Sequence, residues 1–267
     1  MRRSRLVGFV APLLLALGLG FTQAASAQAA SNSGGYVALG DSYASGVGSG
    51  SYISSSGSCD RSTKAAAYLW NAAHSPASFA FNACSGATTD DVMANQLGSL
   101  NSSTSLVSIS IGGNDAGFAN VMQTCVLNSD STCLSAISSA ESYITSTLPG
   151  KLDTVYNAIH SKAPNARVVV VGYPRFYLLG QTCLGLSDTK RSAINDAADI
   201  LDNTIQTRVS AHGFVFGDVR TPFSTHEICS GSSWLHSTNW LDLTESYHPT
   251  ADGQSGGYLP VLTNAAG

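Results

Sequence analysis

The strongest constraint on the fold is an alternation of short apolar segments with longer segments of helical periodicity. The segment at 167–173 contains an unbroken run of valines from Val168 to Val171. A strand that is apolar on both faces is typical of a parallel sheet that is covered on both sides. The clearest helical spacing of apolar residues lies at 188–210, in Ile194, Ala197, Ala198, Leu201, Ile205 and Val209. This alternation predicts an α/β fold, with a central parallel sheet between helical layers.

The remaining elements follow from the same patterns. We expect strands at 36–39, 79–82, 106–111, 167–173 and 214–216, and helices at 64–74, 90–100, 116–125, 135–160 and 188–210, with a final helix after 252. Pro149-Gly150 should kink or divide the long helical region, because proline lacks a backbone N–H. Pro260 should limit the final helix, and residues 220–245 look irregular.

The N-terminus has the pattern of a secretory signal peptide. Arg2, Arg3 and Arg5 precede an apolar run at 6–21, and Ala25-Ser26-Ala27 fits a signal-peptidase site. The run is too short for a comfortable membrane span, so we expect no stable membrane anchor. The sequence therefore predicts a signal peptide at 1–27, one domain at 28–267 and an extracellular location.

Charge and cysteine usage exclude several classes of function. The chain has 13 Lys and Arg against 17 Asp and Glu, and it contains no basic run, so we expect no nucleic-acid partner. Six cysteines, Cys59, Cys84, Cys125, Cys133, Cys183 and Cys229, all lie beyond the cleavage site. An even number in an exported chain favours three disulfides, and no pair has the Cys-x-x-Cys spacing of zinc or redox sites. The count alone leaves their pairing open.

Four polar motifs lie at or near the ends of predicted elements. They are Gly40-Asp41-Ser42, Cys84-Ser85-Gly86, Gly112-Gly113-Asn114-Asp115 and Ser246-Tyr247-His248-Pro249. Ligands collect at the carboxyl ends of strands in open α/β sheets, so a serine directly after strand 36–39 is a candidate nucleophile. Taken singly, each motif has a structural alternative: Ser42 could cap a helix, Gly86 could be a loop glycine and Asn114 could form an Asx turn.

Together, the four motifs resemble those of the SGNH or GDSL hydrolases, which supply Ser, Gly, Asn and His in this order. The resemblance spans Tyr36 to Pro249. Tyr43, where the family name has Leu, and the six cysteines look most like the secreted actinobacterial lipases and esterases of this family. The resemblance implies a flavodoxin-like three-layer α/β/α sandwich. It also implies disulfides Cys59–Cys84, Cys125–Cys133 and Cys183–Cys229.

The resemblance assigns chemistry to the motif residues. Ser42 would be the nucleophile and His248 its base, since a serine hydroxyl needs a base to react at neutral pH. The oxyanion hole would consist of the backbone N–H groups of Ser42 and Gly86 and the side-chain amide of Asn114. Ser255 lies in a sequence that matches the Gly-x-Ser-x-Gly nucleophile motif, but no strand precedes it and no histidine follows, so we expect a structural role.

The group that orients His248 is open to two interpretations. Much of the family has an aspartate three residues before the histidine, and Glu245 stands there in this chain. Some actinobacterial relatives use a backbone carbonyl two residues before the histidine, which is that of Ser246 here. We favour the Ser246 carbonyl, which gives a Ser42–His248 dyad, and keep Glu245 as the alternative.

The sequence thus predicts a secreted, monomeric serine ester hydrolase, a lipase or esterase, that acts on acyl lipids without a metal or cofactor. The enzymatic alternatives are a phospholipase A1 and a carbohydrate (acetyl) esterase. The alternative of another class is a secreted binding protein that has lost turnover. Candidates for an acyl groove are Tyr43, Phe118, Phe176, Tyr177 and Leu178, each of which could equally be a core residue.

Overall fold

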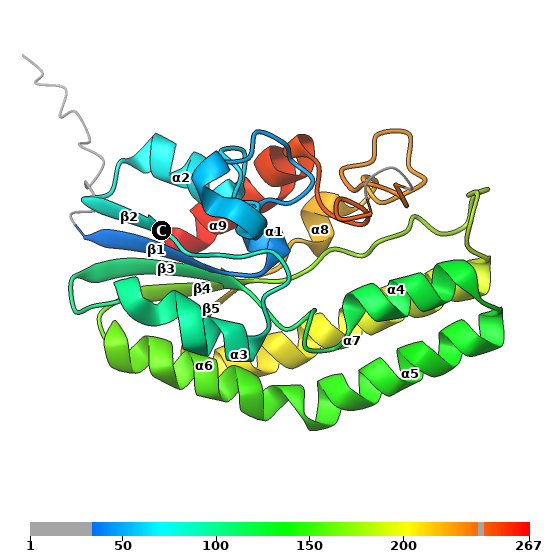
Figure 1. The fold of residues 1–267 in the computed structure, drawn as a ribbon, viewed down its shortest axis with the longest axis horizontal. Helices are drawn as coiled ribbons and strands as arrows, with labels where there is room; N and C mark the ends of the chain where they lie inside the picture. The colour runs from blue at the N-terminus through cyan, green and yellow to red at the C-terminus, as the bar shows by residue number, and fades with distance from the viewer. Residues whose placement is uncertain (1–33, 240–242) are drawn as a thin grey trace, which may run out of the picture. The chain divides into compact units, whose positions relative to one another are not determined.

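The computed structural model describes residues 34–239 and 243–267, so the expected signal peptide lies outside the described residues. Within these ranges, five strands form one sheet in the order β2–β1–β3–β4–β5 (Figure 1). They are β1 (Gly35–Gly40), β2 (Ser78–Phe81), β3 (Thr104–Ser110), β4 (Arg167–Val171) and β5 (Val215–Gly217). Every neighbouring pair is parallel, which confirms the predicted parallel sheet.

Helices cover both faces of the sheet. They are α1 (Ser42–Ser45), α2 (Ala66–His74), α3 (Thr89–Asp91), α4 (Phe118–Leu127), α5 (Asp130–Ser146), α6 (Leu148–Lys162), α7 (Asp188–Ala211), α8 (Arg220–Phe223) and α9 (Leu259–Ala266). Figure 1 shows α2 and α9 on one face, and α6 and part of α7 on the other. This is the expected three-layer α/β/α sandwich. Beyond the carboxyl ends of the strands, α4, α5 and the first part of α7 continue as a helical extension (Figure 1). None of the described helices is long and apolar enough to cross a membrane.

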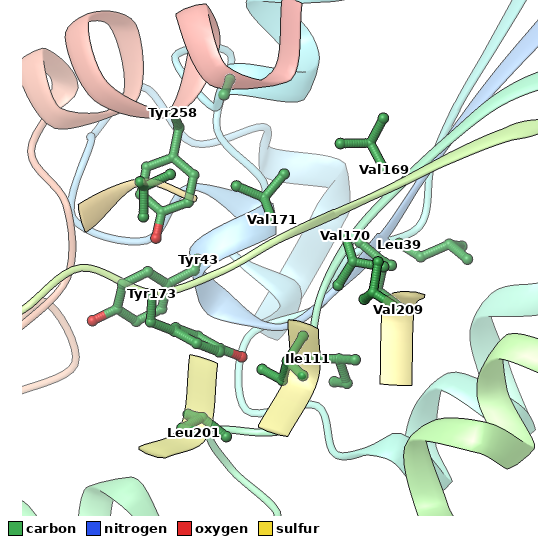
Figure 2. Close-up of a cluster of buried hydrophobic side chains, with 14 of the residues drawn as sticks. Leu39, Tyr43, Ile111, Val169, Val170, Val171, Tyr173, Leu201, Val209 and Tyr258 are labelled. Atoms are coloured by element: carbon green, nitrogen blue, oxygen red, sulfur yellow. The ribbon is translucent and has the colours of Figure 1, made fainter. Parts of the chain in front are cut away.

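The core lies on both sides of the central strands. All four valines of β4 are buried, as their run predicted. Figure 2 shows side chains from both helical layers meeting this strand, with Leu201 and Val209 from α7 on one side and Tyr258 on the other. Tyr43 and Tyr173 lie in the same cluster. The core therefore reaches the carboxyl ends of the strands, where the predicted site residues are.

The proline positions test two predictions. The helical region at 135–160 is divided as expected: α5 ends at Ser146 and Pro149 occupies the first turn of α6, where its missing N–H breaks no hydrogen bond. Pro260 does not limit the final helix. A π-helical turn at Gly253–Tyr258 leads into α9, and Pro260 lies in the first turn of that helix.

The prediction of one regular helix at 90–100 is wrong. The segment consists of α3, a π-helical turn at Val92–Gln96 and a 3₁₀ turn at Leu97–Ser99. The buried Gln96 explains the departure. Its side-chain Oε1 accepts from the Gly40 N–H at 2.7 Å, and its Nε2 donates to the Gly40 carbonyl at 2.9 Å. These bonds hold the segment against the end of β1.

The structure pairs the six cysteines as Cys59–Cys84, Cys125–Cys133 and Cys183–Cys229. The first disulfide is next to the loop that carries Gly86, and the second joins α4 to α5. The third joins the loop before α7 to the segment after α8.

Candidate active site

Ser42 is placed by the turn at the end of β1. Gly40 has φ +121° and packs against Ser110, so a side chain at this position would collide with the β3 backbone. The Asp41 carboxylate accepts from the Tyr43 N–H at 2.9 Å and caps α1. Ser42 is therefore the first residue of a short helix, with its hydroxyl at the carboxyl end of the sheet.

His248 lies beside this serine. Its Nε2 accepts from the Ser42 hydroxyl at 2.7 Å, and its Nδ1–H donates to the Ser246 carbonyl at 3.0 Å. The intervening Tyr247 has φ +67°, a left-handed conformation that is uncommon for a bulky residue. Its carbonyl accepts from the Tyr43 hydroxyl at 2.6 Å. The backbone turn before His248 is thus fixed by contacts from α1.

Glu245 has a different hydrogen-bond partner. Its carboxylate accepts from the Tyr52 hydroxyl at 2.8 Å, and that hydroxyl accepts from the Gly48 N–H at 2.9 Å. Glu245 thereby joins the 46–52 loop to the segment that carries His248. In this arrangement the Nδ1 of His248 is hydrogen-bonded to the Ser246 carbonyl, and the Glu245 carboxylate to Tyr52.

The surroundings of His248 favour a neutral imidazole. Burial lowers the pKa of His248 to about 4, and the nearby His236 acts in the same direction when it is protonated. His248 as a residue is half-buried and lines the pocket. A neutral imidazole with a proton on Nδ1 leaves Nε2 free to accept the proton of a serine hydroxyl.

Gly86 and Asn114 lie next to Ser42. Gly86 has φ +76°, and within residues 34–239 and 243–267 neither its backbone N–H nor that of Ser42 has a hydrogen-bond partner. One amide hydrogen of Asn114 is used, because Nδ2 donates to the Ala87 carbonyl at 3.0 Å. Ser42, Gly86, Asn114 and His248 all line one pocket. Two backbone N–H groups without a partner in these ranges, and an Asn114 amide with one hydrogen left over, therefore belong to residues that line the same pocket.

Several residues that hold this site were not found from the sequence. The Tyr173 hydroxyl donates to the Asp41 carboxylate at 2.5 Å and accepts from the Gly113 N–H at 3.2 Å. It therefore connects the serine turn to the segment that carries Asn114. Burial raises the pKa of Asp41 to about 7. Asp115 accepts from the N–H and the hydroxyl of Thr89, at 2.9 and 2.6 Å, and so joins the same segment to α3.

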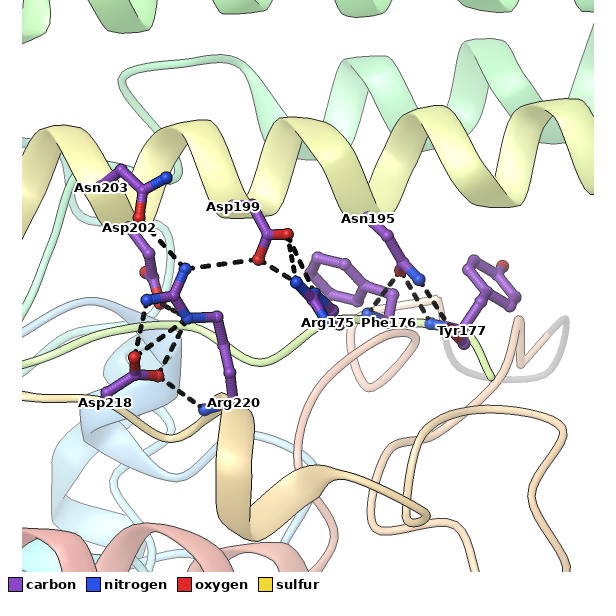
Figure 3. A network of polar contacts seen from close by, with 9 residues as sticks. All are labelled: Arg175, Phe176, Tyr177, Asn195, Asp199, Asp202, Asn203, Asp218 and Arg220. Atoms are coloured by element: carbon purple, nitrogen blue, oxygen red, sulfur yellow. Dashed lines mark hydrogen bonds and ion pairs between the residues drawn. The ribbon is translucent and has the colours of Figure 1, made fainter. Parts of the chain in front are cut away.

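Tyr173 is held in turn by a polar network on α7. Figure 3 shows this network, in which Arg175 contacts Asp199, and Arg220 contacts Asp199, Asp202 and Asn203 of α7 as well as Asp218. The buried Asp202 accepts from the Tyr173 N–H at 2.9 Å. Asn195 binds the backbone of Phe176 and Tyr177 through its amide. The start of the β4–α7 connection is therefore fixed along α7 and brings Tyr173 and Phe176 to the site.

A deep apolar pocket begins at Ser42. It has a volume of about 470 Å³ and extends between α4, α5 and α7. Its apolar wall includes Phe118, Val121, Met122, Val126, Leu127, Ile137, Ala140, Ile144, Phe176, Ile194, Ala197, Ala198, Leu201 and Leu243. Tyr43, Phe118 and Phe176, predicted as groove candidates, line it, whereas Tyr177 and Leu178 do not. The pocket can hold a flexible apolar chain, with the carbonyl carbon of an ester near the Ser42 hydroxyl.

Ser255 is exposed on the π-helical turn before α9 and is far in sequence from any strand end. The neighbouring Gln254 is buried. It accepts from the Ala66 N–H at 2.9 Å and donates to the Tyr43 carbonyl at 3.0 Å. The Gly-x-Ser-x-Gly sequence thus belongs to a packing contact between α2, α1 and the C-terminal helix. No group of three or more His, Cys, Asp or Glu within the described part of the chain is arranged to hold a metal ion.

Comparison with known proteins finds a matching family model, relatives in sequence and similar solved structures. The sequence model described as "GDSL-like Lipase/Acylhydrolase family" matches residues 38–255. The chain is 69% identical to Lipase 1 of Streptomyces coelicolor, with full coverage of both chains. Among solved structures, the crystal structure of phospholipase A1 from Streptomyces albidoflavus NA297 matches this chain with a TM-score of 0.86. The two sequences are 60% identical, and the match covers 87% of this chain and 99% of that chain. The extracellular lipase of Streptomyces rimosus is also 60% identical, with 87% and 100% covered and a TM-score of 0.85.

Proposed function

Since the chain belongs to the GDSL-like lipase/acylhydrolase family of ester hydrolases, we propose that it is secreted and cleaves acyl-lipid esters through a Ser42–His248 dyad. The observation that carries the proposal is the 2.7 Å contact between the Ser42 hydroxyl and His248 Nε2, at the entrance of an apolar pocket. The three disulfides and the relative named as an extracellular lipase support secretion.

The reaction begins with acylation. His248 Nε2 takes the Ser42 proton while Ser42 Oγ forms a bond to the ester carbonyl carbon. The carbonyl electron pair moves to oxygen, and the backbone N–H groups of Ser42 and Gly86 and the Asn114 amide stabilise this oxyanion. The Ser246 carbonyl accepts from Nδ1–H and holds the imidazole in the required tautomer. The oxyanion then collapses, and His248 gives its proton to the leaving alcohol.

Deacylation uses the same groups in reverse. His248 takes a proton from a water molecule, whose oxygen attacks the acyl-enzyme carbonyl. Collapse of the second oxyanion breaks the bond to Ser42 Oγ, and the proton returns to Ser42 from His248. A carboxylic acid is released, and neither step requires an external oxidant or reductant.

The apolar pocket favours an acyl chain over an acetyl group. Sixteen of its lining residues are Ala, Val, Leu, Ile, Met or Phe, and the relatives are named as lipases and a phospholipase A1. We therefore place phospholipase A1 activity as the second candidate, because the same pocket would hold the acyl chain of a phospholipid. A silent binding protein would keep the pocket but would not react with a fluorophosphonate probe. Labelling at Ser42 distinguishes the two classes.

The first test measures acyl-chain preference with p-nitrophenyl esters of short, medium and long chains. We expect the wild type to prefer medium or long chains, whereas a preference for acetate would favour a carbohydrate esterase. Ala197 lines the pocket on α7, and Ala197→Phe should fill part of the space. Each methylene that loses its contact costs about 0.8 kcal/mol, so we expect a loss of about tenfold or more in kcat/KM for long chains. Acetate hydrolysis should change little, and equal loss on all esters would contradict the assignment of the pocket.

A second test uses pH. Only neutral His248 can accept the serine proton, and burial lowers the pKa of His248 to about 4. Activity should therefore persist below the usual imidazole range and fall only as pH approaches the lowered value. We expect the acid limb of kcat/KM to have an apparent pKa well below about 6.5. An acid limb with an apparent pKa at or above about 6.5 would show that His248 titrates as a solvated imidazole. Circular dichroism over the same range separates titration from acid unfolding.

A third test separates the Ser246 carbonyl from Glu245. Glu245→Gln keeps an oxygen that can accept from Tyr52, so we expect kcat to fall by less than about threefold. A carboxylate that orients a catalytic histidine contributes far more, since the amide variant of a protease triad loses about 10⁴ in kcat. A loss of that size with unchanged melting temperature would assign the orienting role to Glu245 and reject the dyad. Tyr52→Phe is the matched control, because it removes the hydrogen bond between Tyr52 and Glu245 and keeps the carboxylate.

A further inference from the structure

Four leucines are exposed on segments that line the apolar pocket or lead into α7 beside it. Leu184 is 95% exposed, Leu243 62%, Leu127 61% and Leu179 44%. We call this set the leucine rim. A leucine that is almost fully solvated contributes nothing to the core, and a group of exposed apolar side chains usually marks an interaction surface.

Two residues of the leucine rim belong to the pocket. Leu127, at the end of α4, and Leu243, in the segment before His248, line the pocket and face solvent. Leu179 and Leu184 lie on the β4–α7 connection, which Figure 1 shows running along α4 and α7 to the end of the helical extension. The start of α7 is attached to the end of α4, because Lys190 Nζ donates to the Cys125 and Asn128 carbonyls at 2.8 and 2.6 Å.

The loop that carries Leu184 is fixed at its base. The disulfide Cys183–Cys229 holds the residue before Leu184 to the segment after α8. Ser187, at the end of the loop, caps α7 and donates to Asp130 at 3.0 Å. The loop that carries Leu184 is therefore attached at both ends, so the loop loses little conformational freedom when Leu184 is buried in a partner.

The surface around these leucines is almost free of charge. Residues 116–129 and 176–187 contain no Asp, Glu, Lys or Arg, so inserting these segments into a lipid layer desolvates no ion. The charged residues that border these two segments in the sequence are Asp115, Asp130 and Asp188, with Arg175 as the one cation. Leu243 follows Asp242 and lies two residues before Glu245, and the whole chain has a formal net charge of −4. These charges disfavour an anionic lipid surface and are compatible with a neutral or zwitterionic one.

We propose that the leucine rim docks onto a neutral or zwitterionic lipid surface, so that an acyl chain moves from the lipid layer into the apolar pocket without crossing water. This inference rests on the proposed lipid hydrolysis and names the physical state of the substrate that the site uses. Burying one leucine side chain strengthens binding by about tenfold or more. Docking by this surface brings the pocket to the lipid layer, because Leu127 and Leu243 belong to both the rim and the pocket wall.

The test measures binding to phosphatidylcholine vesicles by sedimentation, with Ser42→Ala as the parent so that no lipid is hydrolysed. We expect Leu179→Ser/Leu184→Ser to weaken the vesicle partition constant by about tenfold or more. Neither leucine lines the pocket. The same double substitution with Ser42 present should therefore hydrolyse soluble p-nitrophenyl acetate within about twofold of wild type. Met93→Ser is the matched control, since Met93 is 38% exposed on the turn after α3.

Each outcome decides the proposal. Equal vesicle binding by the parent and the double variant would overturn it, as would tighter binding to phosphatidylglycerol vesicles than to phosphatidylcholine vesicles. A dimer that the double substitution disperses, measured by light scattering without lipid, would assign the rim to a second copy of the chain. Rim-dependent binding without lipid hydrolysis by the wild type would reject the proposed function and keep the docking surface. Unchanged binding with normal lipid hydrolysis would reject the docking surface alone.

Discussion

Replacing Ser42 by alanine is expected to lower kcat for p-nitrophenyl esters by about 10⁶-fold, because the variant has no nucleophile to form an acyl-enzyme. Loss of the serine alone has an effect of this size in a serine protease, where the remaining rate comes from the oxyanion hole and substrate binding. The Ser42 hydroxyl donates only to His248 among the described residues. Its removal should therefore leave the melting temperature nearly unchanged.

The matched control for this experiment is Ser255→Ala. Ser255 matches a nucleophile motif in the sequence, but it is exposed on the turn before α9. We expect its substitution to leave kcat within about twofold of wild type. Activity that survives Ser42→Ala would show that Ser42 is not the nucleophile, and loss of activity in Ser255→Ala with an intact fold would transfer that role. Mass spectrometry after fluorophosphonate labelling identifies the reacting serine independently.

The parts of the fold that the sequence predicted are those with a periodic signal. The valine run of β4, the helical spacing on α7 and the division at Pro149 each depend on residues close together in the chain. Such patterns report burial and backbone geometry directly. Parallel strands then bring their carboxyl ends to one edge. This explains why Ser42, after β1, and Asn114, after β3, lie at one edge of the sheet. His248 follows no strand and is brought to Ser42 by the long segment after α8.

The parts that it did not predict depend on single long-range contacts. Gln96 and Gln254 are buried amides whose partners are backbone groups of Gly40, Tyr43 and Ala66. Nothing in the local pattern distinguishes such a glutamine from a solvated one. Both lie in or next to π-helical turns, which replace the regular helices that the spacing had indicated. An added hydrogen-bond requirement thus overrides helical propensity at both positions.

The hydrogen-bond partner of Glu245 could not be predicted from the sequence either. Position alone allowed a carboxylate three residues before His248 to contact the imidazole. The left-handed turn at Tyr247 instead directs the Ser246 carbonyl to Nδ1, and Tyr52 binds the Glu245 carboxylate. A tyrosine in a left-handed conformation has no local sequence signal. It is stabilised by the Tyr43 hydroxyl, which reaches the Tyr247 carbonyl from another part of the fold.

Replacing Asn114 by alanine is expected to lower kcat by about 10²–10³-fold and to change KM little. The Asn114 amide has one hydrogen bonded to the Ala87 carbonyl and a second that is left over for a substrate, and Asn114 lines the same pocket as Ser42. A donor that contacts the oxygen mainly when it carries negative charge stabilises the transition state rather than the bound ester. The effect therefore belongs in kcat, measured with a soluble ester under saturating conditions.

The control must separate this donor from the support that Asn114 gives to the Gly86 loop. Asp115 attaches the same segment to Thr89 through two hydrogen bonds, and it does not line the pocket. Asp115→Ala should therefore loosen the attachment, lower the melting temperature and reduce kcat by less than about tenfold. Equal losses of kcat in the two variants would mean that Asn114 acts only by holding the loop. A much larger loss in Asn114→Ala, with the smaller change in melting temperature, would identify its amide as an oxyanion donor, because only that variant removes an N–H from the space beside Ser42.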